Sequence, residues 1–373
     1  MDFTFTEEQD AVRDLAAQIF EGHATVERVK EVERSDERVD RELWRALADA
    51  GLLAIAVPEE HGGSGLGLIE LCLLLEQQGR RVAPVPLWPT LVLGALPLAE
   101  FGTPEQQREW LPGVAAGDVM LTAALSEPGV NDALHPQVTA TRDGDTWRLD
   151  GSKPSVPAAH VADRVLVPAG TGDGEVGVFL VDPAGTGVDS TPATTTDRSR
   201  VAHLTLSGAP AERLGSTEDV DGCRVTAWML DRALVGLCAM QVGVSEGALR
   251  MAADYTSERH QFGRPLSTFQ GVALKAADAY IDTEAMRVTL WQAAWRLTAG
   301  LDATQEIMVA KWWAAEGGQR VVHITQHLHG GMGADVDYPV HRYFLWGKQI
   351  EVTLGGASAQ LARLGRALAE SPA

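Results

Sequence analysis

The sequence predicts an α+β multidomain fold, with an N-terminal helical domain, a middle β-barrel or β-sandwich domain and a C-terminal four-helix bundle. The chain has 373 residues, which is more than one hydrophobic core usually serves. Apolar residues recur at helical spacing in the first third and again in the last part of the chain. Between them Gly, Pro, Thr and Asp become frequent and the apolar runs shorten, as in short strands separated by turns. We therefore expect domains at 1–116, 117–222 and 223–373.

Composition and charge exclude several classes of protein. Lys and Arg total 31 against 51 Asp and Glu, which gives a net charge of −20. Such a chain repels phosphate backbones, so we expect no nucleic-acid partner. The three cysteines form no C-x-x-C pair, which argues against a disulfide scaffold or zinc site and favours a cytoplasmic location. No signal peptide is visible and no stretch of 18 apolar residues occurs, so no membrane span is expected.

The N-terminal third is predicted to begin with two clear helices. Thr6 and Gln9 have the spacing of a capping box, and apolar residues then follow a period of 3.6 residues as far as Phe20. A further helix is expected to begin near Asp40, to bury its Leu and Trp residues and to end at Gly51.

The signals that follow are shorter. Residues 52–57, before a proline, indicate a short extended segment. A glycine-rich loop over 59–67 lacks the register and the strand–turn–helix context of a dinucleotide fingerprint. A helix is expected to resume over 69–75, and the mixed charges of 27–42 are most simply a solvated helix face.

The middle and last parts of the chain differ in their periodicity. Short strands are expected at 146–149, 164–167, 175–181 and 203–206. A long helix without proline is then expected over 225–258, and it would run roughly 50 Å. Further helices are expected at 274–297, 305–328 and 359–368.

Five groups of motifs follow one another along the chain. They are Phe5-Thr-Glu-Glu-Gln9, Val57-Pro-Glu-Glu-His-Gly-Gly-Ser-Gly-Leu-Gly67, Leu125-Ser-Glu-Pro-Gly129, Glu258-Arg-His-Gln-Phe-Gly-Arg-Pro265 and His329-Gly-Gly-Met-Gly333. Each is weak alone, but their order is specific. With them the sequence resembles the FAD-dependent acyl-CoA dehydrogenase family nearly end to end, and in particular the subunits of heteromeric members whose own sites are incomplete.

The resemblance implies a cofactor, a substrate and partners. These are FAD, an acyl-CoA thioester, a tetramer of identical or unlike subunits, and an electron-transfer flavoprotein as acceptor. The family reaction removes the α proton with a carboxylate and transfers a hydride from Cβ to the flavin. It needs a base close to Cα, donors that polarise the thioester carbonyl and a flavin held against the Cα–Cβ bond.

The resemblance assigns the grip on the nucleotide half of FAD to Arg259, Gln261, Phe262 and Gln270. In the family this half is held by a neighbouring subunit. A guanidinium suits a pyrophosphate because it is permanently charged and offers a planar fork of donors. An Arg at the end of a helix also neutralises the helix dipole, but the whole motif favours FAD.

The contacts with the flavin ring are only partly kept. The family usually has Gly-x-Lys-x-Trp-Ile-Thr where this chain has Gly151-Ser-Lys-Pro-Ser-Val-Pro157. Ser155 therefore replaces the Trp that covers the flavin. Pro157 replaces a Thr and has no N–H to donate.

Other cofactor contacts implied by the resemblance are better kept. Leu125 and Ser126 match the loop at the entry to the β domain, and Gly330 and Gly331 match the glycine loop. His327 stands where the family usually has Gln. The Gln one place earlier would face another direction on a helix.

The resemblance gives two positions for the catalytic carboxylate. Counting from the Tyr-Pro-Val motif places Leu354 at the usual position, and Leu cannot take a proton. Glu351, one turn earlier, is more simply a solvated surface charge.

Some members carry the base at the start of the long helix, immediately before an Arg. Asp231 and Arg232 stand there. Burial would make Asp231 a better base near neutral pH, while a place near a helix N-terminus or a local pair with Arg232 is an equal alternative. Arg232 aligns with an Arg beside the acyl-CoA site, and a structural salt bridge is an equal reading.

Three functions therefore stay open. The chain is one subunit of a heteromeric dehydrogenase that lends its FAD grip to an unlike partner, a self-sufficient homotetramer that uses Asp231, or a non-catalytic scaffold or acyl-CoA-binding subunit. No metal is expected, because His323 and His327 share a helix face without a third ligand at suitable spacing.

Overall fold

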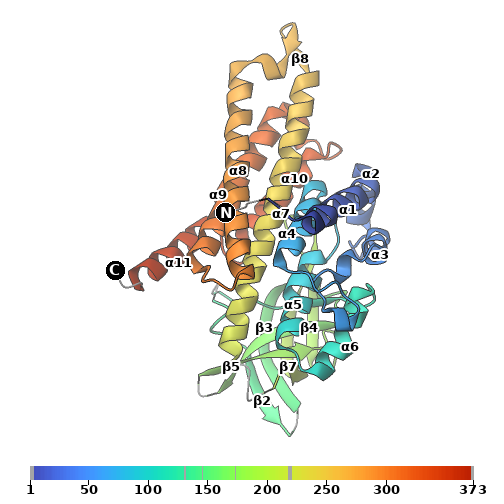
Figure 1. The fold of residues 1–373 in the computed structure, drawn as a ribbon, viewed down its shortest axis with the longest axis vertical. Coiled ribbons are helices and arrows are strands. Elements are labelled where there is room, and N and C mark those ends of the chain that lie inside the picture. Colours follow the sequence, from blue (N-terminus) through green and yellow to red (C-terminus); the bar gives the residue numbers. More distant parts are fainter. Residues whose placement is uncertain (1–3, 130–131, 145, 173, 217–220, 371–373) are drawn as a thin grey trace. The chain divides into compact units, whose positions relative to one another are not determined.

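The computed structural model describes residues 4–129, 132–144, 146–172, 174–216 and 221–370. The elements follow the predicted order of helices, strands and helices (Figure 1). The chain forms two compact units. The bundle unit consists of Met1–Lys30, Cys72–Ala83 and Leu234–Ala373, and the sheet unit consists of Glu31–Leu71 and Pro84–Ala233. The domain boundaries at 116 and 222 stay predictions.

The first helices begin where their caps predict. In α1 (Glu7–His23) the Thr6 hydroxyl accepts from the Gln9 N–H, and the Gln9 side chain accepts from the Thr6 N–H, which confirms the capping box. The mixed-charge stretch contains α2 (Val26–Arg34). Helix α3 (Arg41–Asp49) starts after Asp40, whose carboxylate accepts from the Leu43 N–H at 3.1 Å. These caps satisfy backbone donors that a helix start leaves without partners.

The expected extended segment over residues 52–57 is wrong. The chain forms a 3₁₀ turn there, η1 (Leu52–Ala54), and the Val57 N–H donates to Ala54 O at 3.1 Å. An isolated extended segment has no ladder partners for its buried backbone groups, whereas a tight turn satisfies them locally.

The remaining helices of the N-terminal third are more numerous than predicted. They are η2 (Glu59–His61), α4 (Leu68–Arg81), the π-helical η3 (Trp88–Ala95), α5 (Leu96–Phe101) and α6 (Pro104–Ala115). Helix α4 confirms the helix expected over 69–75. Helix α6 starts with a second capping box, formed by Thr103 and Gln106.

The middle part forms one sheet whose pairings close into a ring. Its strands are β1 (Leu121–Ala123), β2 (Thr139–Asp143), β3 (Thr146–Pro157), β4 (Arg164–Gly172), β5 (Glu175–Val181), β6 (Val188–Thr194) and β7 (Arg200–Arg213). The ring runs β4–β2–β3–β7–β5 and back to β4, with β1 beside β4 and β6 beside β7. A closed ring leaves few free edges, and it supports the barrel alternative of the prediction.

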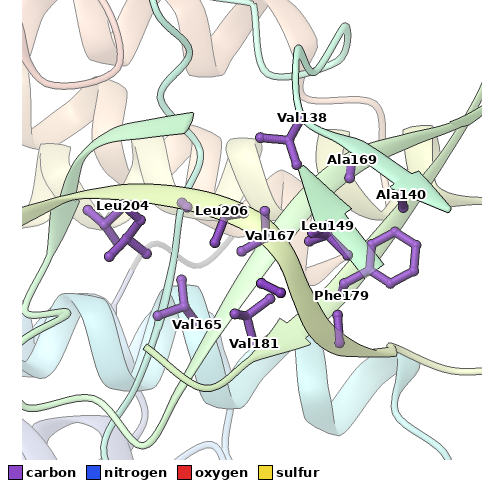
Figure 2. Packing of buried hydrophobic residues seen from close by; sticks show 14 of the residues in the cluster. Val138, Ala140, Leu149, Val165, Val167, Ala169, Phe179, Val181, Leu204 and Leu206 are labelled. Atoms are coloured by element: carbon purple, nitrogen blue, oxygen red, sulfur yellow. The ribbon is translucent and has the colours of Figure 1, made fainter. Parts of the chain in front are cut away.

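Alternating residues of these strands fill the interior of the sheet unit. Leu149 of β3, Val165 of β4, Phe179 of β5 and Leu204 of β7 have no exposed surface and belong to one cluster (Figure 2). Burial of such side chains is the main favourable term in folding. This core fixes the strands that carry the predicted flavin-ring segment.

The last part is helical, as predicted. After the long α7 (Gly222–Glu258) come the short strands β8 (His260–Gln261) and β9 (Arg264–Pro265), and then η4 (Leu266–Thr268), α8 (Gln270–Thr298), α9 (Thr304–Leu328), η5 (Gly330–Ala334), α10 (Val340–Val352) and α11 (Ala357–Glu370). Among the described residues, α7 alone is long and apolar enough to span a membrane, and 72% of its apolar window is buried within the protein. A core helix passes the same test.

A charge network joins three helices of the bundle unit. The Arg287 guanidinium of α8 contacts the carboxylate of Glu76 on α4 at 2.7 Å and that of Glu246 on α7 at 2.9 Å. Arg80 contacts Glu246 at 2.7 Å and Glu76 at 3.4 Å. Two cations balance two carboxylates, which limits the cost of burying them.

Candidate functional site

The predicted FAD-gripping residues lie directly after the end of α7, on a β-hairpin and at the first residue of α8. Strands β8 and β9 pair through His260 and Pro265, and the loop consists only of Phe262 and Gly263. Their φ angles are 53° and 79°, as in a type I′ hairpin turn. Glycine adopts this region freely, but for an aromatic residue it is strained.

The Phe262 side chain is 92% exposed at the tip of this hairpin. Its ring lies edge-on to that of Phe269, with centroids 6.1 Å apart. A strained aromatic residue held in water at the end of a tight turn costs free energy in the isolated chain. The geometry therefore suits a contact that lies outside this chain.

The polar members of the predicted grip are also exposed. Arg259 follows the end of α7, and its N–H closes the last helical turn on Tyr255 O at 2.9 Å. Within the described parts of the chain, its guanidinium has no hydrogen bond or ion pair. Gln261 on β8 and Gln270 at the start of α8 are exposed as well. This set fits the pyrophosphate of a dinucleotide, because a free guanidinium and amide donors stand beside a helix N-terminus.

The glycine loop offers open backbone at two of the predicted positions. A Cβ atom at Gly330 or Gly331 would meet no atom within 4 Å, and both residues are exposed. At Gly333 a Cβ atom would come within 2.4 Å of Gln326 O, so this glycine is required by packing. The open pair leaves the backbone accessible to a ligand, and His327 beside it is exposed.

Gln326 has a structural role in the glycine loop. Its Nε2 donates to Gly333 O at 2.9 Å, which holds the loop closed on α9. Gln326 is half-buried, whereas His327 is exposed.

An aromatic stack connects the glycine loop to the end of α7. The His329 ring lies 4.6 Å from that of Tyr255, at an interplanar angle of 26°, and its Nδ1 donates to Thr325 O at 2.7 Å. Burial lowers the pKa of His329, which favours the neutral ring. The stack therefore packs the glycine loop directly against the last turn of α7, which precedes Arg259.

The predicted flavin-ring segment lies in the sheet unit and is irregular. The β3–β7 register shifts between Lys153 and Val156, and Ser155 has a φ of 52° within this bulge. The Ser155 N–H donates to His203 Nδ1 at 3.1 Å. Because Pro157 has no N–H, the segment offers neither a covering aromatic ring nor these two backbone donors. It does not fit the flavin ring in the way that the family motif does.

The second predicted ring contact is held by a buried ion pair. Leu125 is buried and Ser126 half-buried directly after β1. The next residue, Glu127, pairs with Lys153 of β3, and neither side chain has exposed surface. The sequence analysis did not predict this pair. A Lys at an inward-facing position of a strand, as at Lys153, indicates a buried partner of opposite charge.

Leu354, at the position where the family usually carries the catalytic carboxylate, cannot act as a base. Leu354 is half-buried with a φ of 56°, and Gly355 follows with a φ of 100°. Glu351 is bound to Lys348, whose Nζ lies 2.5 Å from its Oε2, so it is an ion-paired group and not a free surface charge.

A buried Lys, also missed by sequence reasoning, holds the end of α10 near this position. Lys311 Nζ donates to Ile350 O at 3.0 Å and to Glu351 O at 3.1 Å. Burial lowers the pKa of Lys311 to about 8. The ammonium group stabilises carbonyls that a helix end leaves without partners.

The alternative base, Asp231, lies in the sheet unit. Helix α7 begins at Gly222, so Asp231 is in the third turn and not near the N-terminus, where a dipole effect is confined to the first turn. The structure thus removes the dipole explanation for Asp231. The Arg232 guanidinium lies 3.6 Å from the centroid of the Trp228 ring and donates to Trp228 O at 3.3 Å. Burial lowers the pKa of Arg232 to about 10.

The described residues contain no group of three His, Cys, Asp or Glu side chains arranged for a metal ion. His323 lies edge-on to Phe344, with ring centroids 4.7 Å apart, and is exposed together with His327.

Comparison with known proteins identifies a family for most of the chain. Residues 6–118 match the model of the acyl-CoA dehydrogenase N-terminal domain, and residues 220–369 match that of the acyl-CoA dehydrogenase C-terminal domain. Among curated proteins, the chain is 42% identical to acyl-CoA dehydrogenase FadE27 of Mycobacterium tuberculosis, with all of both chains covered. It is 38% identical to acyl-CoA dehydrogenase FadE28 of the same organism, with 98% of each chain covered.

Two solved structures are similar over nearly the whole chain. A variant of the Tcur3481–Tcur3483 steroid ACAD is 54% identical, with a TM-score of 0.92 and 98% of each chain covered. A chain of the ChsE4–ChsE5 complex from Mycobacterium tuberculosis is 43% identical, with a TM-score of 0.93 and full coverage of both chains.

Proposed function

This chain belongs to the acyl-CoA dehydrogenase family of FAD-dependent oxidoreductases, and on this premise we propose that it is one subunit of a two-subunit-type dehydrogenase. In this enzyme it grips the nucleotide half of an FAD whose ring and catalytic base belong to an unlike family member. The reaction is α,β-dehydrogenation of an acyl-CoA thioester.

One contrast carries the proposal. The grip is complete and exposed, with Arg259 free of partners within the described residues and Phe262 held in water at a strained turn. The ring segment is closed, because His203 accepts from the Ser155 N–H and Pro157 has no donor. A chain that bound both the nucleotide half and the ring half of FAD would be expected to keep both sets of contacts.

The absence of a free carboxylate at the usual position also supports a catalytic base on the unlike subunit. Leu354 stands at the usual position, and Glu351 beside it is bound to Lys348. Without a base at that end, proton removal from Cα needs a carboxylate from elsewhere. An unlike subunit supplies it most simply.

The relatives support an unlike partner and a bulky substrate. Two of the similar structures are named as pairs of different chains, Tcur3481–Tcur3483 and ChsE4–ChsE5, and the first is named as a steroid ACAD. We infer a steroid or similarly large acyl-CoA as the substrate class, oxidised in β-oxidation-type catabolism in the cytoplasm. An electron-transfer flavoprotein is the inferred acceptor.

The test is an absorbance spectrum of this chain, purified alone and together with an unlike family member, before and after acyl-CoA is added. We expect little flavin with the chain alone, and a bound flavin that substrate bleaches in the joint preparation. Full flavin content and acyl-CoA oxidation by the chain alone would refute the unlike partner. Absence of flavin from both preparations would favour a scaffold subunit.

A pair of variants tests the grip itself. Arg259→Ala should lower the flavin content of the joint preparation at least tenfold, since it removes the permanent charge that faces the pyrophosphate. Arg250→Ala is the matched control, because Arg250 is an exposed Arg of α7 paired with Asp254. The control should retain its flavin.

A self-sufficient enzyme that uses Asp231 remains the second candidate. Asp231 is half-buried beside Arg232, whose guanidinium is held on Trp228.

A further inference from the structure

The hairpin between α7 and α8 carries a second exposed arginine, Arg264, which is not among the predicted FAD contacts. Strands β8 and β9 place Gln261 and Arg264 directly opposite each other. Directly opposed side chains of an antiparallel pair project from the same face, with their Cβ atoms about 5 Å apart. Arg264 therefore shares one face of the hairpin with Gln261, which is a predicted contact of the nucleotide half of FAD.

The guanidinium of Arg264 lies on an aromatic ring of the same segment. Its central carbon is 4.1 Å from the centroid of the Phe269 ring. Phe269 is half-buried, precedes Gln270 and lies edge-on to Phe262. An arginine that is held over an aromatic face keeps its N–H donors available for a further partner. Phe269 thus places these donors among the predicted contacts of the nucleotide.

The chain itself supplies no anion for this arginine. Within the residues that the structure describes, the guanidinium of Arg264 has no hydrogen bond or ion pair, and Glu258 pairs with neither Arg264 nor Arg259. By contrast, the exposed Arg250 contacts Asp254 at 3.2 Å. Two unpaired guanidinium groups on one hairpin, in a chain with a net charge of −20, indicate an anion from outside the chain.

The pyrophosphate of FAD needs more positive charge than Arg259 supplies. It is a diester with one negative charge on each of its two phosphates at neutral pH. Arg259 balances one of these charges, and the start of α8 offers only about half an elementary charge. A second guanidinium balances the remaining phosphate and adds charge-assisted hydrogen bonds.

We propose that Arg264 is a second cation for the pyrophosphate of FAD, which it contacts together with Arg259. Phe269 is then a positioning residue, because it acts on the cofactor by holding Arg264. This inference rests on the proposed function and adds a residue to the nucleotide contacts.

Titration of FAD into the flavin-free joint preparation with an unlike subunit tests the contact. Arg264→Gln should weaken FAD binding by roughly 10- to 100-fold, which is the usual effect of losing a hydrogen bond to a charged group. Arg264→Lys should recover part of this loss, because it keeps the charge but not the planar fork of donors. Arg250→Gln removes the same charge elsewhere in the bundle unit and should bind FAD as the wild type does.

Ionic strength distinguishes a phosphate contact from a purely structural role of Arg264. The FAD Kd of the wild type should rise more steeply than that of Arg264→Gln between about 0.05 and 0.5 M NaCl, because salt screens an exposed charge contact. If Arg264 served only to support Phe269, the variant would change the Kd by the same factor at every salt concentration. An identical salt dependence of the two proteins would overturn the proposal.

A carboxylate of the unlike subunit is the competing partner for Arg264. In that case Arg264→Gln would lower the mass of the joint assembly in light scattering, and the remaining assembly would bind FAD with the wild-type Kd. This result would also overturn the proposal. The expected result is an assembly of unchanged mass with weaker FAD binding.

The second cation and the proposed function can fail separately. If Arg259→Ala loses its flavin while Arg264→Gln binds FAD like the wild type at every salt concentration, the second cation is refuted and the proposed function stands. A wild-type joint preparation that binds no FAD would contradict both.

Discussion

Lys153 and Glu127 form an ion pair in which neither side chain has exposed surface, although 26 residues separate them in the sequence. The pair ties β3 to the loop after β1, and the second carboxylate oxygen of Glu127 accepts from the Gln137 N–H at 3.2 Å. Burial lowers the pKa of Lys153, while the charge of Glu127 opposes this shift. The two segments expected beside a flavin ring are thus joined by a structural contact that does not require a flavin.

Lys153→Met should destabilise the protein by about 3–5 kcal/mol, because it leaves the Glu127 carboxylate buried without a cation. Equilibrium unfolding in urea measures the change. The double variant Lys153→Met/Glu127→Gln should recover most of the loss, since no buried charge remains. A single variant that unfolds at the wild-type urea concentration would show that the pair is not buried in solution.

The stability of the protein should depend on pH through Lys311. Its pKa is lowered from 10.5 to about 8 by burial, so between these values the unfolded chain binds more protons than the folded one. Stability therefore rises with pH across this window. Relative to Lys311→Met, the wild type should gain about 3 kcal/mol between pH 7.5 and pH 10.5. An unchanged difference between the two proteins over this range would mean that Lys311 titrates as an exposed amine.

Phe262→Asn should separate stability from cofactor binding. Asn tolerates the positive φ that this turn position requires, so the free chain should be unchanged or more stable by up to about 1 kcal/mol. The joint preparation with an unlike subunit should nevertheless lose flavin, because the exposed ring is gone. Thermal unfolding and flavin absorbance check the two effects. Retention of all flavin would remove Phe262 from the grip.

Much of this fold could be predicted from local signals. Thr6 and Gln9 define the start of α1 because a capping box depends on neighbouring residues only. The extended segment expected at 52–57 was wrong because a short apolar run does not distinguish a strand from a buried turn. Helix α7 begins three residues before the predicted start at 225, so Asp231 lies farther from the helix N-terminus than the sequence predicts.

The contacts that decide the function of the site are not local. The Ser155 N–H is engaged by His203 on β7, 48 residues later, and no sequence pattern reports this. The sequence motif predicts which residues contact the nucleotide half of FAD. The backbone strain at Phe262 depends on a two-residue hairpin loop, which only the structure defines.

Asp231→Asn distinguishes the two candidate enzymes. If the base belongs to an unlike subunit, the variant should keep full turnover and full flavin in the joint preparation. If this chain is self-sufficient, the variant should keep its flavin and lose reduction by acyl-CoA by a factor of roughly 10² or more. Rapid-mixing absorbance of flavin reduction measures both.

The flavin content of the joint assembly tests the division of work most directly. Each pair of unlike chains should hold one FAD. The nucleotide contacts of this chain complete the site whose ring contacts belong to the partner. The opposite combination, with the ring contacts taken from this chain, should bind no FAD because this chain lacks a fitting ring segment. Quantifying released FAD against the mass of each chain provides the ratio. One FAD per pair is the expected result, and two FAD per pair would mean that this chain holds a flavin ring of its own.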